Sequence, residues 1–292
     1  MADDHPSRRT FELLSDEVRL RVITALGDAS GSEGYATLAF SDLQRAADVD
    51  DSSRLTYHLG ELRDEFVEKT DEGYTLTLAG IRAYQAVIAH RSVPEVEVEP
   101  FRVPWECESC GGGLEARYEG GRAYLTCGSC GDHRVRYPVD AGRIDPDDPE
   151  SITVALQNTL IRDYTSMFNG VCPYCTGHVE VDFAFDSDHW DEFDVATDDI
   201  PINAACTECS WFVYVNLPAV LRIEEAVQSF FAERGRNIWE EPVWTDEFVW
   251  TRESVTRDPI QVEGYFSADG DRLRVVVDEH LTVVEREILE EE

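Results

Sequence analysis

The chain has 292 residues, of which 60 are acidic and 25 basic, giving a formal net charge of −35. It is 42% apolar and 10% aromatic, which excludes an intrinsically disordered chain, and its length allows two or three domains. Acidity spread along the whole chain, with Lys69 as the only lysine, indicates adaptation to molar salt, where charges are screened beyond about 3 Å.

The first residues, "MADDHPSRRTFELL", lack the apolar segment of a signal peptide. No run approaches the roughly 18 apolar residues that a membrane span needs. We therefore expect a soluble, cytoplasmic protein without a membrane partner. In a reducing compartment its eight cysteines are poor candidates for disulfides.

Residues 11–91 predict a compact, mainly helical unit. Ser15 can cap a first helix that ends at Gly27. The segment "YATLAF" is a short strand candidate, and Ser41 can cap a second helix, "DLQRAADV". A third helix follows, with leucines at i, i+4 and i+7 that we expect to be buried: Leu55, Leu59 and Leu62.

A β-hairpin is predicted after the third helix. "FVEKT" and "YTLT" flank the turn "DEG", and Thr77 can cap a last helix, "LAGIRAYQAVIAH". Three helices followed by a two-stranded wing predict a winged helix-turn-helix over residues 1–91. In this arrangement the third helix presents its side chains to the major groove of DNA.

The third helix is predicted to turn Ser53, Tyr57 and Gly60 outward, with Arg54 and Thr56 on the flanks. Arginine can bond guanine twice, and hydroxyl groups suit phosphates or bases. Residues 53–60 carry no carboxylate in this very acidic chain. The candidate DNA contacts are Ser41, Arg45, Ser53, Arg54, Thr56, Tyr57, His58 and Lys69. Among them His58 lies nearest the buried leucines, where packing is the simpler expectation.

The charge of this unit permits two interpretations. Residues 1–92 hold 17 acidic and 10 basic residues, which makes them the least acidic part of the chain, as DNA binding requires. The hairpin tip "KTDEGYT" is acidic, however, whereas a wing that grips DNA is usually basic. A winged helix used only for protein contacts is therefore the alternative.

Residues 101–292 are expected to form a carboxy-terminal domain after an extended linker, "SVPEVEVEP" (92–100). "SITVALQNTLIRDYTSMF" and, within the segment 217–292, "LPAVLRIEEAVQSFFAERG" have helical spacing. The end of the chain predicts strands joined by the hairpin turn "ADGD".

The eight cysteines form two clusters, within residues 101–138 and 171–216. Each cluster has two Cys-x2-Cys pairs, which can surround one tetrahedral ion and leave no open position. Gly111 and Gly131 follow the pairs of the first cluster, where a left-handed backbone is easiest for glycine. We expect two structural zinc ions in two zinc-ribbon-like modules, with the ligands Cys107, Cys110, Cys127, Cys130 and Cys172, Cys175, Cys206, Cys209.

Other chemistries use the same cysteines. Iron in a rubredoxin-like site has the same four ligands, and Cys-x2-Cys is also a disulfide or redox motif. His133 and His178 lie close to the pairs in sequence, but four thiolates already saturate an ion. The loops around both clusters are acidic, which favours an interaction or ligand-responsive module over a nucleic-acid surface.

The segment "NIWEEPVWTDEFVW" contains Trp239, Trp244 and Trp250. They could line an apolar pocket, although a core or a domain interface is the simpler interpretation. The sequence has no P-loop, dinucleotide-binding, zinc-protease or nucleophile-elbow motif. We therefore predict no enzymatic activity.

Three stretches, "LSDEVRLRVITALGD", "LAFSDLQRAADVDDSSRLTYHLGEL" and "FVEKTDEGYTLTLAG", resemble the ArsR-like winged-helix regulators of halophilic archaea. The similarity extends to a following cysteine-rich segment, "WECESCGGGLEARYEGG". It implies a homodimer on a palindromic promoter site and a recognition helix that carries Ser53, Arg54, Thr56 and Tyr57. Metal-sensing members of the wider family place paired cysteines on the helix corresponding to 41–48, whereas this chain has none before Cys107.

The sequence thus predicts an α+β chain with a winged helix-turn-helix, two zinc-ribbon-like β modules with intervening helices, and a β-rich carboxy-terminal segment. We expect a sequence-specific transcription regulator of a halophilic archaeon. Its expected partners are double-stranded promoter DNA, a second copy of the chain, and the transcription machinery or a small-molecule effector. The alternative is a zinc-ribbon interaction adaptor whose winged helix does not bind DNA.

Overall fold

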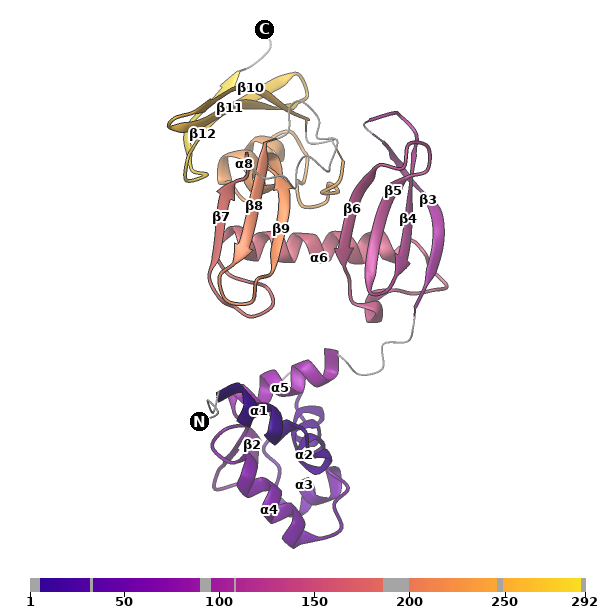
Figure 1. Ribbon diagram of the computed structural model, residues 1–292, viewed down its shortest axis with the longest axis vertical. Coiled ribbons are helices and arrows are strands. Elements are labelled where there is room, and N and C mark those ends of the chain that lie inside the picture. Colours follow the sequence, from indigo (N-terminus) through magenta and orange to yellow (C-terminus); the bar gives the residue numbers. More distant parts are fainter. Residues whose placement is uncertain are drawn as a thin grey trace, which may run out of the picture. The chain divides into compact units, whose positions relative to one another are not determined.

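Figure 1 shows a computed structural model of the chain, which is a mixed α+β protein with several small sheets. The structure describes residues 6–31, 34–89, 96–107, 109–185, 200–245 and 249–289. The chain divides into two compact units, Met1–Val93 (unit 1) and Pro94–Glu292 (unit 2), and each is described by itself. Among the described helices, none is both long and apolar enough to cross a lipid bilayer.

Unit 1 consists of helices and one small hairpin. The helices α1 (Pro6–Leu14), α2 (Glu17–Asp28), α3 (Phe40–Ala46) and α4 (Ser52–Leu62) come first. The antiparallel strands β1 (Val67–Lys69) and β2 (Tyr74–Leu76) and the helix α5 (Leu78–Ala89) follow. The segment "YATLAF" contributes only an isolated antiparallel bridge, between Leu38 and Tyr74 of β2.

The core of unit 1 is built as the helical spacing predicts. Leu55, Leu59 and Leu62 of α4 are buried in one apolar cluster with residues of α2 such as Val22. Thr77 Oγ1 accepts a hydrogen bond from the amide of Gly80 across 3.1 Å, so the predicted cap of α5 is confirmed.

The cap of α2 differs from the prediction. Oδ1 of Asp16, not the hydroxyl of Ser15, accepts hydrogen bonds from the amides of Val18 (2.9 Å) and Arg19 (3.2 Å). Ser15 instead donates from Oγ to the carbonyl of Glu12 in α1, a helix that the sequence does not predict. The prediction was wrong because a preceding helix already engages Ser15.

Two further helix boundaries were predicted wrongly. α3 begins at Phe40, and Ala39 holds its cap position without a side-chain hydrogen bond, so Ser41 is not a cap. Gly27 does not end α2 but lies inside it. A Cβ at Gly27 would be 2.3 Å from Cδ2 of Tyr84 in α5, so glycine is needed here for the close approach of two helices.

The first sheet of unit 2 is antiparallel, with the order β3-β4-β5-β6. Its strands are β3 (Val98–Glu106), β4 (Gly113–Glu119), β5 (Arg122–Cys127) and β6 (His133–Pro138). β3 includes the last three residues of the stretch 92–100 that we expected to be a linker. Pro100 and Pro104 fall where the pairing of β3 with β4 is irregular, and an edge strand tolerates prolines at such positions.

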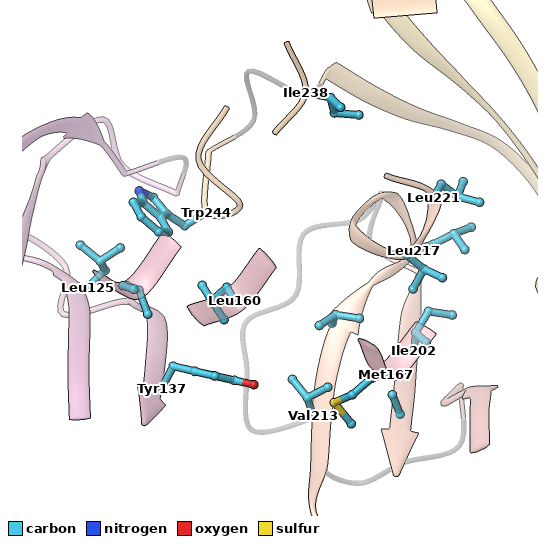
Figure 2. Close-up of a cluster of buried hydrophobic side chains, with 14 of the residues drawn as sticks. Leu125, Tyr137, Leu160, Met167, Ile202, Val213, Leu217, Leu221, Ile238 and Trp244 are labelled. Atoms are coloured by element: carbon cyan, nitrogen blue, oxygen red, sulfur yellow. The ribbon is translucent and has the colours of Figure 1, made fainter. Parts of the chain in front are cut away.

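A second sheet, β7-β8-β9, is joined to the first by a long helix. Its strands are β7 (Val179–Phe183), β8 (Pro201–Cys206) and β9 (Phe212–Asn216). A 3-10 turn, η1 (Ala141–Arg143), leads to α6 (Ser151–Phe168), which has the predicted bounds and contacts strands of both sheets. Figure 2 shows the resulting cluster, with side chains from the first sheet, α6 and the second sheet: Leu125, Tyr137, Leu160, Met167, Ile202 and Val213.

The last part of unit 2 is a third antiparallel sheet with two short helices before it. The predicted helical stretch 217–235 is divided into α7 (Leu217–Leu221) and α8 (Glu225–Ala232). The sheet has the order β10-β11-β12-β13, with β10 (Val249–Arg257), β11 (Ile260–Ala268), β12 (Asp271–Asp278) and β13 (Val283–Leu289). The turn "ADGD" joins β11 to β12 as predicted. α8 packs on the sheet through Phe231, whose ring centroid lies 6.0 Å from that of Phe266.

The three tryptophans singled out in the sequence belong to the core of unit 2. Trp244 is buried and meets Trp105 edge to face, with ring centroids 5.2 Å apart. Trp239 and Trp250 are partly buried against the same apolar cluster. These contacts favour the core interpretation over a pocket.

Candidate metal centres and candidate DNA-contact helix

The first four-cysteine cluster lies at one end of the first sheet. Cys107 directly follows β3, Cys127 ends β5, and Cys110 and Cys130 lie in the turns that follow them. The Sγ atoms of Cys107 and Cys130 are 3.8 Å apart, and those of Cys110 and Cys127 are 3.5 Å apart. The first cysteine of each pair is buried and the second is exposed.

The second cluster repeats this arrangement on the second sheet. Cys172 and Cys175 precede β7, Cys206 ends β8, and Cys209 lies in the next turn. The Sγ distances are 3.7 Å from Cys172 to Cys209 and 3.5 Å from Cys175 to Cys206. Within each cluster all four sulfur atoms lie within 4.8 Å of one another.

These distances fit a metal ion and not a disulfide. A disulfide bond is about 2.05 Å long. A tetrahedral ion with metal–sulfur bonds of about 2.3 Å holds its sulfur ligands about 3.8 Å apart. The eight cysteines are free thiols in these two groups, so both clusters could hold a metal ion, as their spacing predicts.

The two clusters share one topology despite their different spacing in the sequence. In both, the strand that follows the first cysteine pair is antiparallel to the strand that ends in the second pair. Leu114 of β4 is paired with Cys127 of β5, and Val179 of β7 is paired with Cys206 of β8. The longer spacing of the second cluster falls in the connection between β7 and β8, outside the metal-binding turns.

The residue after each cysteine pair has a left-handed backbone. Gly111 and Gly131 adopt φ of 69° and 78° in the first cluster, as the sequence predicts. Thr176 and Ser210 adopt φ of 62° and 57° at the matching positions of the second. The second cluster therefore makes the same turns with residues that are less suited to them.

Backbone amides prepare one thiol of each cluster for metal binding. The amides of Cys130 and Ser129 donate to Sγ of Cys127 and lower the pKa of Cys127 to about 6. The amide of Cys209 likewise lowers the pKa of Cys206 to about 7. The amide of Asp132 favours the thiolate of Cys130, but the neighbouring sulfurs prevail and raise the pKa of Cys130 to about 12. A cation removes this competition because it stabilises four thiolates together.

Asp132 places a carboxylate beside the first cluster. Its Oδ2 lies 3.8 Å from Sγ of Cys107, accepts a hydrogen bond from Oγ of Ser109 (3.2 Å), and is 3.7 Å from Nη1 of Arg134. His133 and His178 are exposed, and neither belongs to a described cluster of possible ligands.

α4 exposes the side chains that the helical spacing turns outward. Asp51 caps the helix and accepts from the amide of Ser53 across 2.8 Å. Ser53, Arg54 and Thr56 are exposed, and Tyr57 is 62% exposed. Thr56 donates from Oγ1 to the carbonyl of Ser52 across 2.8 Å, so its hydroxyl is already engaged.

The other candidate DNA contacts lie on neighbouring elements of unit 1. Ser41 and Arg45 are exposed on α3, and Nη1 of Arg45 is 3.1 Å from Oδ1 of Asp42. Lys69 is exposed at the end of β1, with Nζ 5.9 Å from the ring centroid of Tyr74.

His58 is buried and must be removed from the candidate DNA contacts. Its Nδ1 lies 3.4 Å from Oδ1 of Asp16, the cap of α2, without the geometry of a hydrogen bond. Its ring also meets Tyr57, with centroids 5.2 Å apart. A side chain that joins α4 to α2 in this way cannot reach a base, as the position of His58 beside the buried leucines indicates.

Comparison with known protein families gives two matches. Residues 104–283 match a domain of unknown function, DUF7351, which covers more than half of the chain. The chain belongs to the DUF7351 family. Residues 7–87 match a second domain of unknown function, DUF7347. No curated protein and no solved structure matches the chain.

The structure adds one polar group to the DUF7351 region that the sequence does not predict. Asp163 of α6 is fully buried, and its carboxylate accepts hydrogen bonds from Tyr137 and from Tyr174, which lies between Cys172 and Cys175. The only signal in the sequence is an aspartate on the apolar side of α6. Such a signal marks a buried polar residue without indicating its partners.

Proposed function

We propose that this DUF7351 chain is a sequence-specific, DNA-binding transcription regulator. In this proposal unit 1 is a winged helix-turn-helix, in which α3 supports α4 and the β1–β2 hairpin is the wing. α4 enters the major groove. The observation that carries the proposal is the composition of the outward face of α4.

The recognition face consists of Ser53, Arg54, Tyr57 and Gly60. All four are exposed and none is acidic, in a chain with 60 acidic residues, and the one carboxylate within α4 is the exposed Glu61 in its last turn. Nothing lies within 4 Å of the place where a Cβ of Gly60 would be, so a phosphate or a base edge can approach the helix there. Arg54 has no ion pair with any described carboxylate, which leaves its guanidinium group available for the two acceptors of a guanine.

The opposite side of α4 makes this face rigid. Leu55 and Leu62 are fully buried, and His58 joins the helix to the cap of α2. Direct readout depends on such positioning, because each good two-bond contact discriminates between bases by only about 1–3 kcal/mol. Similarity to ArsR-like regulators further supports a homodimer on an inverted repeat.

We propose that both four-cysteine clusters hold structural zinc. Four thiolates leave no position for water or substrate, so such an ion supplies folding energy and no reaction chemistry. Cys107, Cys127, Cys172 and Cys206 are part of the apolar core of unit 2, which ties each metal-binding turn to its sheet.

A haloarchaeal setting accounts for the excess of acidic residues. Counterion release normally drives DNA binding, but this contribution falls as salt rises. In molar salt, hydrogen bonds and apolar contacts made directly to the bases remain. A face with hydroxyl groups and one arginine suits those conditions better than a strongly basic one.

An interaction adaptor is the second candidate. The tip of the proposed wing exposes Asp71 and Glu72, which would repel a phosphate backbone. In an adaptor, the outward face of α4 would contact a protein instead of DNA.

Chromosome-wide immunoprecipitation of the tagged full chain distinguishes the two candidates. For the wild type and for the Arg82→Ala control on α5, which changes an exposed arginine outside α4, we expect the same discrete promoter peaks. For Arg54→Ala/Tyr57→Ala we expect those peaks to be lost at equal protein abundance. Unchanged peaks in the double variant would contradict the proposal and favour the adaptor.

A further inference from the structure

The open side of the first sheet in unit 2 carries a group of arginines. We name it the arginine face and define it by Arg102, Arg117, Arg122, Tyr124 and Arg136. Residues alternate between the two sides of a strand. The neighbours of these residues, such as Leu114, Ala116 and Leu125, fill the buried side, so the arginines gather on the other.

Tyr124 is the centre of the arginine face. Arg117 of β4 is paired with Tyr124 of β5, which is paired in turn with Arg136 of β6, so the three residues form one row across the sheet. The guanidinium carbon of Arg117 lies 3.8 Å from the ring centroid of Tyr124, and that of Arg136 lies 6.0 Å from it. Cation–π attraction therefore holds both guanidinium groups beside the same ring.

Three of the four arginines form no ion pair within the described part of the chain. Arg102, Arg122 and Arg136 are exposed and form no ion pair with any carboxylate in the described part of the chain, while Arg117 pairs with Glu119. Elsewhere in unit 2 arginines commonly have such partners, as Arg234 has in Asp271 at 2.7 Å. Acidic residues outnumber basic ones 60 to 25 in this chain, so carboxylates are abundant as partners for arginine. Three arginines without an ion pair to a described carboxylate, on one side of one sheet, therefore stand apart.

The local charge sets this face apart from the matching face of the second sheet. Glu99, Glu106, Glu115 and Glu119 lie on the same side as the four arginines, so the arginine face is close to neutral in a chain of net charge −35. The corresponding side of the second sheet carries Glu180 and Asp182 and, opposite them, no basic residue on β8 or β9. Two modules of one topology thus differ in charge, because only the first offers arginines on this side.

We propose that the arginine face binds the phosphate backbone of double-stranded DNA beside the site that unit 1 contacts. This inference rests on the proposed function, because unit 1 is what would bring DNA close to unit 2. Strands lie about 5 Å apart, so guanidinium groups on neighbouring strands can engage several phosphates of one duplex. The planar guanidinium group also makes two parallel hydrogen bonds to one phosphate, a contact that depends on geometry as well as on charge.

The acidic loops around the cysteine clusters predict no nucleic-acid surface here. The proposal differs from that prediction because it rests on the side chains of the strands and not on those of the loops. Arg122 and Arg136 alternate with apolar residues along β5 and β6, so only the paired sheet brings them together with Arg117 of β4. Phosphate contacts of this kind give affinity and orientation without sequence preference.

Fluorescence anisotropy with a labelled random-sequence duplex of about 40 base pairs, titrated between about 0.3 and 1 M KCl, tests the proposal. The test variant of the full chain is Arg102→Gln/Arg122→Gln/Arg136→Gln. The matched control, Arg252→Gln/Arg272→Gln/Arg286→Gln, removes the same charge from the third sheet. Circular dichroism establishes that both variants remain folded.

We expect the test variant to bind the duplex about tenfold or more weakly at the lowest salt. Its plot of log affinity against log salt should be shallower by about 2.7, for three lost phosphate contacts at about 0.9 each. The control should keep the wild-type slope. Equal slopes for the test variant and the control would overturn the proposal. Loss of binding to phosphatidylglycerol vesicles with unchanged DNA binding would overturn it too, because the face would then serve a lipid surface.

The variant Arg54→Ala/Tyr57→Ala separates this inference from the function proposed for unit 1. If the arginine face acts as proposed, that variant loses its promoter peaks while its salt slope on random-sequence DNA falls by no more than about 0.9, for the one arginine removed. If only unit 1 binds DNA, the test variant keeps the wild-type slope instead of losing about 2.7.

Discussion

The hydroxyl of Tyr174 donates a hydrogen bond to Oδ2 of Asp163 across 3.1 Å, which ties a residue inside the Cys172–Cys175 pair to the middle of α6. The same oxygen accepts a hydrogen bond from Tyr137 of the first sheet across 3.0 Å. Nε of Arg162 donates to the other carboxylate oxygen across 2.6 Å. Burial, and then the charge of Asp163, raise the pKa of both tyrosines well above the usual range, so both remain donors.

Asp163 should therefore contribute more to stability than either tyrosine hydroxyl alone. Asp163→Ala leaves two tyrosine hydroxyls without their acceptor and should lower the free energy of unfolding by about 3 kcal/mol. Tyr174→Phe removes one hydrogen bond and should cost about 1 kcal/mol. Denaturant unfolding at constant salt measures both. Equal losses would show that Asp163 does not connect the two sheets as described.

Metal content should follow the two clusters independently. We expect two zinc ions per wild-type chain by elemental analysis and one in either Cys127→Ser or Cys206→Ser, because each variant removes one of four ligands. A chelator should unfold unit 2, since metal binding contributes to its folding. A red-coloured protein that contains iron would contradict the zinc assignment. Loss of both ions in a single variant would contradict their independence.

The left-handed residues that follow the cysteine pairs can be exchanged between the two clusters as a test. Gly131 and Ser210 hold matching positions at φ of 78° and 57°. Gly131→Ser should destabilise the first module by about 1 kcal/mol, because an L residue is strained in this region. Ser210→Gly should stabilise the second module by about 0.5 kcal/mol, because relief of strain is partly offset by the entropy of glycine in the unfolded chain. Thermal unfolding of the two variants checks the opposite signs, and a shift of the same sign in both would exclude this explanation.

The cap of α2 should make stability depend on acid pH. Burial raises the pKa of Asp16, but the amide of Arg19, the nearby His58 and the amide of Val18 prevail and hold it below its ordinary value. A carboxyl whose pKa is lower in the folded state adds stability above the unfolded pKa of about 3.9, and this contribution is lost as the pH falls through the folded pKa.

Asp16→Asn keeps a capping oxygen but removes its charge. The variant should therefore be less stable than the wild type near neutral pH, and the difference should shrink below about pH 4. Asp16→Ala should lose a further contribution of about 1 kcal/mol at every pH, because the cap itself is gone. Urea unfolding across this pH range measures both differences. A wild-type advantage over Asp16→Asn that grows towards acid pH would refute the argument.

The features that depend on local sequence, such as helices and cysteine pairs, could be predicted from residue spacing. The features that depend on contacts between distant segments could not. α6 and the buried leucines of α4 followed from apolar spacing, and the cysteine pairs followed from the geometry of a tetrahedral ion. The role of Gly27 could not be predicted, because it depends on Tyr84 in a distant helix. The arginine face could not be predicted from the sequence for a similar reason: its members lie on four strands, and only their register brings them together.

Selection of bound duplexes from a random-sequence pool in about 2 M KCl most directly tests the central claim, that the outward face of α4 reads DNA bases. The wild-type chain and Arg82→Ala should enrich the same inverted repeat, and Arg54→Ala/Tyr57→Ala should enrich none. Failure of the wild type to enrich any motif, or enrichment of the same motif by the double variant, would contradict the claim.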